Sequence, residues 1–175
     1  METPGVSMKG AYRDVLIGND SQTLHDSGWV SNTIVERGRI LLAGFMRNDS
    51  PSGIRFLAVG RGEESWDTSA RLSAEPTATD LVDRYTPTIP FDDLTVVYLD
   101  ESDGVVAEPT NRLQITVTLK AGYPEIEAPA VSYPLREFGL FGAFNGTDYM
   151  VNYVKHPVIN KDASATLVRV IRLDF

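Results

Sequence analysis

The C-terminal stretch 133–175 constrains the fold more than any other part of the sequence, because it contains three successive strand patterns. These segments are rich in β-branched and aromatic residues and are bounded by turn formers: 135–141, 147–154 and 166–175. Asn145-Gly146 supplies the positive φ angles of a tight hairpin, which predicts that the first two strands are antiparallel neighbours. The chain ends inside the third strand, so we expect its terminus to be held in a sheet or by a partner.

Further strand patterns precede this stretch. They cover 12–17, then either 22–24 or 29–30 as its pairing partner, then 54–59, 94–99 and 113–120. The run 94–99 is apolar apart from Thr95, and we interpret it as a strand covered on both faces. In 113–120 apolar and polar residues alternate, which predicts one dry face and one wet face.

One segment, 31–48, has the pattern of a long amphipathic helix. Thr33 and Glu36 have the spacing of a capping box, and apolar or small residues follow on one face: Ile34, Gly38, Leu41, Leu42 and Phe45. A glycine in that stripe predicts close contact with a strand. The segment 77–83 repeats the capping spacing and predicts one short helical turn.

Together these patterns predict an α+β fold that is mainly β. We expect antiparallel sheets or a sandwich, with the amphipathic helix at about 31–48 packed on the sheet, because most gaps are too short for helical crossovers. The predicted organisation is an N-terminal arm, 1–10, followed by a single globular β-rich domain, 11–175.

Charge and composition argue against several classes of function. The net charge of -8 opposes binding to nucleic acid or to an anionic membrane, since both need a positive field. The sequence has no cysteine, which excludes disulfides and thiolate chemistry. The N-terminus lacks a basic segment followed by an apolar run, so we expect no signal peptide, and no apolar stretch is long enough to span a bilayer.

No local motif assembles an active site. His25 and His156 have no second histidine or carboxylate at metal-binding spacing, so we interpret both as structural or exposed. The acidic run 100–104 matches a calcium loop only in part and fits a solvated hairpin tip, and 60–62 lacks the rest of a phosphate loop. We therefore predict no catalytic, cofactor-binding or metal-binding residues. A cleft that gathered His156 with two carboxylates would indicate an enzyme instead.

Several aromatic residues are candidates for a protein interface. Trp29 and Trp66 lie in predicted loops, where they serve either as core anchors or as interface residues, because aromatics are enriched at interfaces. The full set of interface candidates is Trp29, Trp66, Phe138, Phe141, Phe144 and Phe175.

A set of short motifs resembles one group of known proteins. The motifs are Asp26-Ser27-Gly28-Trp29, 32–35, 38–43 and 57–62, and then Glu137-Phe138-Gly139-Leu140-Phe141, 157–161 and 167–175. Over most of the chain they resemble the small tail-fibre or tail-collar type proteins of bacteriophages and of phage-tail-like contractile injection systems. The element at 79–84 departs from the pattern, because Asp83 and Arg84 stand side by side.

This resemblance implies a structural particle component that is assembled in the bacterial cytoplasm and is often oligomeric. We therefore expect a tail-fibre attachment, baseplate, collar or cap piece that binds copies of itself and other tail or baseplate proteins. Its last strand could then add to a neighbour's sheet. The alternatives are a carbohydrate or cell-surface binding module, with a surface glycan as partner, and a small enzyme of unrecognised type.

Overall fold

The structure is a computed structural model that describes residues 7–69 and 72–175. Its helical segments are α1 (Glu36–Met46) and two short 3-10 turns, η1 (Glu64–Thr68) and η2 (Phe91–Asp93). Its strands are β1 (Lys9–Ile17), β2 (Thr23–Asp26), β3 (Val30–Ile34), β4 (Ser52–Gly60), β5 (Ile89–Pro90), β6 (Leu94–Leu99), β7 (Val105–Val106), β8 (Arg112–Leu119), β9 (Ser132–Phe144), β10 (Thr147–Asp162) and β11 (Thr166–Asp174). The prediction of a mainly β fold with one helix packed on a sheet is confirmed. Among the described residues, none of the helices is both long and apolar enough to cross a membrane.

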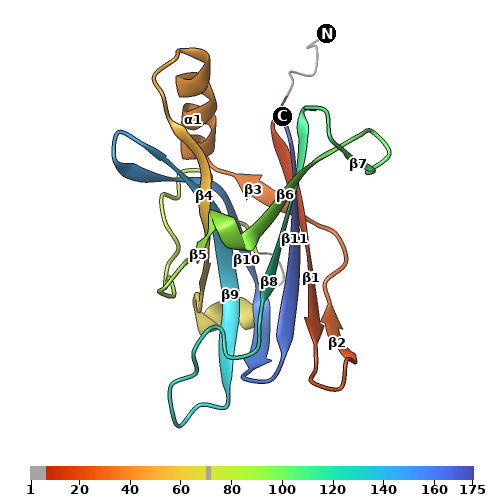
Figure 1. Ribbon diagram of the computed structural model, residues 1–175. Helices are drawn as coiled ribbons and strands as arrows, with labels where there is room; N and C mark the ends of the chain where they lie inside the picture. Colours follow the sequence, from red (N-terminus) through yellow and green to blue (C-terminus); the bar gives the residue numbers. More distant parts are fainter. Residues whose placement is uncertain (1–6, 70–71) are drawn as a thin grey trace.

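The strands form one curled antiparallel sheet with two halves (Figure 1). One half has the order β5-β4-β9-β10 and the other β1-β11-β8-β6-β7, with β2 added to β1. Strand β3 joins them, because it pairs with β1 at Gly10 to Tyr12 and with β10 at Asn152 and Tyr153. The inner faces of both halves meet in one apolar core.

The C-terminal stretch forms the three predicted strands and the predicted hairpin, but β10 continues beyond the predicted end at 154 to Asp162. Strands β9 and β10 are antiparallel neighbours, and Asn145 and Gly146 between them have φ angles of 51° and 75°. Strand β11 lies in the other half, where β1 and β8 cover both of its edges. The expectation that this last strand adds to a neighbour's sheet is therefore wrong for the folded chain, since its backbone groups are already paired.

The apolar side chains that alternate along 113–120 lie on the inner face of β8, as predicted. Ile115, Val117 and Leu119 are buried in the core, and each such side chain stabilises the fold by about 1.5–3 kcal/mol. The run 94–99 forms β6 as predicted, but it is not covered on both faces, because Thr95 is exposed.

Helix α1 is shorter than the predicted 31–48. Residues up to Ile34 belong to β3, and Thr33 pairs with β10 across the sheet, so the expected capping box does not form. Val35 is the N-cap and makes no side-chain capping bond. The close contact predicted at Gly38 is confirmed, because a Cβ atom there would lie 2.6 Å from the Val151 carbonyl oxygen.

Two other predictions need correction. The segment 77–83 contains turns and bends but no helical turn. Strand β1 already begins at Lys9, within the predicted arm 1–10, whose residues 1–6 lie outside the described part of the chain.

Candidate functional site

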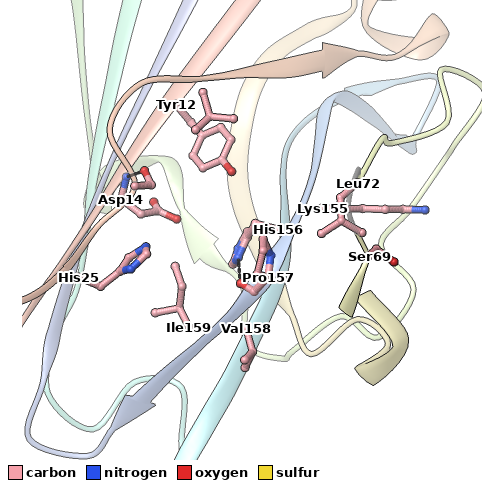
Figure 2. A pocket seen from close by; sticks show the side chains of 12 residues that line it. Tyr12, Asp14, His25, Ser69, Leu72, Lys155, His156, Pro157, Val158 and Ile159 are labelled. Carbon is pink, nitrogen blue, oxygen red and sulfur yellow. Dashed lines mark hydrogen bonds between the residues drawn. The ribbon is translucent and has the colours of Figure 1, made fainter. Parts of the chain in front are cut away.

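A lateral cleft opens between β1–β2 on one side and the second half of β10 on the other (Figure 2). The pairing of β10 with β9 shifts register between Lys155 and Ile159. Pro157, within this shift, has no N–H to donate, and the Val158 N–H bonds to Asp67 instead, at 3.0 Å. The cleft has a volume of about 390 Å³ and is lined by Tyr12, Asp14, His25, Ser27, Val30, Ser69, Leu72, Lys155, His156, Pro157, Val158 and Ile159.

A fully buried ion pair lies beside this cleft. Arg169 donates from Nε and Nη2 to the two carboxylate oxygens of Asp14, at 2.7 and 2.6 Å, and neither side chain is exposed. The two residues are cross-strand partners on β1 and β11, at positions that otherwise carry core residues. The Arg169 guanidinium carbon also lies 3.6 Å from the centre of the Phe138 ring. The pair therefore lies within the apolar core. A bidentate contact joins the two side chains, and the guanidinium group stacks on an aromatic ring.

His156 extends this polar cluster from the opposite half of the sheet. Its Nδ1 lies 2.8 Å from the Pro157 carbonyl oxygen, which can only accept, so Nδ1 carries the proton. Its Nε2 is then free to accept from Arg169 Nη2 at 3.3 Å. Burial, with the nearby Arg169 charge, lowers the pKa of His156 to about 4. The imidazole is therefore neutral at pH 7.

The polar groups around the cleft are largely engaged with one another. Both Asp14 oxygens accept from Arg169, and the Ser27 hydroxyl donates to the Gly28 carbonyl and accepts from the Asp14 N–H. The Lys155 ammonium binds Glu75 at 2.7 Å, and Figure 2 shows its side chain extending away from the middle of the cleft. The described polar groups of the cleft do not form the nucleophile–base contact that covalent catalysis needs.

A cleft that gathers His156 with two carboxylates would indicate an enzyme. The cleft does bring His25 and His156 together with residues from distant segments, but its lining contains one carboxylate, Asp14. Among the described residues, no group of three or more histidine, aspartate or glutamate side chains is arranged to hold a metal ion. The acidic run at 100–104 forms a turn, in which Asp100 accepts from the N–H groups of Ser102 and Gly104.

A second surface, the end groove, is lined by residues of α1 together with Leu173 and Phe175 near the end of the chain. Figure 1 shows α1 and the C-terminus at the same end of the molecule. The end groove has a volume of about 250 Å³, and every residue that lines it is apolar or glycine: Met8, Gly38, Leu41, Leu42, Phe45, Gly53, Ile54, Phe91, Val96, Leu113, Val151, Leu173 and Phe175. Phe45 and Phe91 are 44% and 45% exposed, and the adjacent Met46 is 87% exposed. A contiguous apolar surface of this kind marks interaction sites on folded proteins.

Three of the aromatic interface candidates do not lie on the surface. Phe138 and Phe141 are buried on opposite faces of β9, the first in the main core and the second in a smaller core on the outer face. Trp66, in η1, is buried with the Lys155 ammonium 4.9 Å from its ring centre. The prediction that these three offer contact surface is wrong, because the main core covers Phe138, and Ala74 and Leu81 from the segment before β5 pack with Phe141 in the smaller core.

The other three candidates are accessible but do not form one patch. Trp29 is 44% exposed and lies under the Arg172 guanidinium, at 4.2 Å from its ring centre. Phe144 is partly buried against Tyr149, and Phe175 lines the end groove. The exposure of Phe45, Met46 and Phe91 was not predicted, because Phe45 was assigned to the packed face of the helix and the other two were not singled out. The sequence signal that could have indicated this surface is the apolar side chains at the end of the helix pattern and beside a turn.

No protein-family model, no curated protein and no solved structure gives a match to this chain. The resemblance to small phage-tail proteins therefore stays a prediction.

Proposed function

We propose that this protein is a non-catalytic structural component that acts by protein–protein assembly, in a phage tail or a phage-tail-like contractile injection particle. The observation that carries the assembly proposal is the end groove, whose described lining residues include no polar side chain. The motif resemblance supports the particle as its setting. The internal pairing of polar groups at the lateral cleft supports a non-catalytic role.

The occupant that we propose for the end groove is a second copy of the same chain. Phe45 and Met46 project beside the groove, so one surface carries both an apolar cavity and an apolar protrusion. Two copies related by a twofold axis would each insert this protrusion into the groove of the other, which is the geometry of an isologous interface.

The exposed area is consistent with such a contact. With roughly 200 Å² for a fully exposed large side chain, the exposed fractions of Phe45, Met46 and Phe91 together give about 350 Å². A standard interface buries about 800 Å² on each partner. These three residues would thus supply nearly half of it, and the partly buried Met8 and Phe175 extend the same surface.

Sedimentation equilibrium between about 1 and 100 µM tests the proposal. We expect the wild-type chain to dimerise and Met46→Lys to weaken the dimer at least about tenfold, because a charge would be buried against an apolar cavity. Ile40→Lys is the matched control, since Ile40 lies on the same helix, is 46% exposed and does not line the groove. A wild-type monomer throughout this range, or equal weakening by both variants, would contradict the proposal.

The particle setting needs a separate observation. Antibody labelling of lysates from producing cells, viewed by electron microscopy, should mark tail-like particles at a defined position. Label found only on free protein would refute this setting while leaving the dimer result intact.

A further inference from the structure

The lateral cleft has the size and mixed lining of a small-molecule site. Its volume of about 390 Å³ lies within the roughly 300–1,000 Å³ range of ligand pockets. Val30, Pro157 and Ile159 give it apolar walls, and polar side chains enter from β1 and β2. Apolar walls with a few polar groups are the usual composition of such sites.

Few of these polar groups remain free for a ligand. In the described part of the chain, neither the Tyr12 hydroxyl nor the His25 imidazole makes a hydrogen bond. Figure 2 shows the Tyr12 hydroxyl and the His25 ring directed toward the space between Asp14 and His156. A tyrosine hydroxyl both donates and accepts, so it suits a ligand that carries hydroxyl groups.

The charges around the cleft are compensated within the protein. Asp14 is paired with Arg169, which is fully buried, and Lys155 is paired with Glu75. Burial keeps His156 neutral at pH 7 by lowering its pKa to about 4, and burial raises the pKa of Tyr12 to about 12. Among the described residues that line the cleft, Lys155 and Asp14 are already paired, so an anionic ligand would find no free ammonium group there and a cationic ligand no free carboxylate.

We propose that the lateral cleft binds a small, uncharged, hydroxyl-bearing ligand, of which a monosaccharide is the simplest example. The hydroxyl groups of the sugar bond to Tyr12 and His25, and its C–H face packs against the wall formed by Pro157 and Ile159. This site shares no lining residue with the end groove, so it does not depend on the assembly proposal.

Titration of the ¹⁵N-labelled full chain by two-dimensional NMR tests the proposal. The probes are glucose, galactose, mannose and N-acetylglucosamine, each raised to about 50 mM, well above the millimolar dissociation constants expected of a weak small-ligand site. We expect at least one sugar to give saturable shifts at the amides of 12–14, 25–27 and 156–159. Glucuronate, which is anionic, and benzene, which has no hydroxyl group, are the comparison probes.

Tyr12→Phe identifies the group responsible. This variant removes only the hydroxyl and keeps the ring, whose centre is 5.2 Å from that of Phe138. We expect a five- to tenfold loss of sugar affinity, the effect of about one neutral hydrogen bond. Tyr98→Phe, on β6, should change nothing. The proposal is overturned if no uncharged sugar binds, if glucuronate or benzene binds at least as well, or if Tyr12→Phe leaves the affinity unchanged.

Discussion

The buried pair of Asp14 and Arg169 allows the sharpest test of how this fold is stabilised. Replacing Asp14 by leucine leaves the Arg169 cation fully buried, with the neutral His156 ring as its remaining side-chain acceptor. Removal of one partner from a buried pair costs about 3–5 kcal/mol, because the charge that is left has neither water nor a counter-ion. Since small domains are stable by about 5–15 kcal/mol, this one substitution removes a large part of the total.

The double variant Asp14→Leu/Arg169→Met separates charge from packing. Methionine fills much of the space of the arginine side chain and can contact the Phe138 ring, so we expect the double variant to lie within about 1 kcal/mol of the wild type. The measurement is urea unfolding at pH 7 of the wild type, both single variants and the double variant, read as a double-mutant cycle. A single-variant loss below about 1 kcal/mol, or a double variant as unstable as the sum of the singles, would refute this reasoning.

Three further predictions concern stability. Gly38→Ala should cost about 1–3 kcal/mol in urea unfolding despite better helix propensity, because its Cβ would lie 2.6 Å from a β10 carbonyl oxygen. Gly44→Ala is the control, with its nearest atom at 3.4 Å, and equal losses would contradict the reason. Burial lowers the pKa of His156 from 6.5 to about 4. Between pH 6.5 and pH 4 the unfolded chain therefore binds more protons than the folded chain, and the free energy of unfolding should fall by about 3 kcal/mol as the pH drops through this range. The variant His156→Gln should lose this slope in a pH series of urea midpoints, and an unchanged slope would assign it to other groups. Glu137 accepts hydrogen bonds from two backbone N–H groups, those of Val82 and Asp83, and from the Tyr153 hydroxyl. Glu137→Gln should therefore lower the free energy of unfolding by about 2 kcal/mol and speed amide exchange at 82–83. Tyr153→Phe should lower it by about 1 kcal/mol and leave that exchange slow.

The strands were predictable because their signals are local. Alternation at 113–120 and the Asn145-Gly146 turn set faces and pairing within a few residues. The start of α1 was not predictable in the same way. Thr33 has the chemistry of a cap, but its pairing with Tyr153, distant in sequence, extends β3 up to the helix.

The prediction that Phe138 and Phe141 lie at an interface was wrong for a different reason. The run from Phe138 to Phe144 is almost continuously apolar, which is the pattern of a strand covered on both faces, and this pattern outweighs the aromatic enrichment of interfaces. Phe138 accordingly packs in the inner core and Phe141 in the outer one.

The lateral cleft could not be found from local motifs, because its residues come from 12–30, from Ser69 and Leu72, and from 155–159. One signal was nevertheless present. Tyr12, Asp14 and Leu16 alternate on β1, and Arg169 occupies an apolar position of β11, so each of these strands carries one charge at an inward position. Opposite charges at inward positions predict a buried pair, since an unpaired charge there would be too costly.

The Asp14–Arg169 pair also allows the proposals for the two surfaces to be tested independently of each other. Asp14 and His156 line the lateral cleft and are both bound to Arg169, so the shape of that cleft depends on the buried cluster. The end groove shares no lining residue with the cleft, and its walls are held by α1 and the ends of β6, β8 and β11. Replacement of the pair by leucine and methionine should therefore change sugar binding and leave dimerisation intact, whereas Met46→Lys should do the reverse. The two proposals can thus be tested separately, because the polar cluster beside the lateral cleft and the apolar surface of the end groove have no lining residue in common.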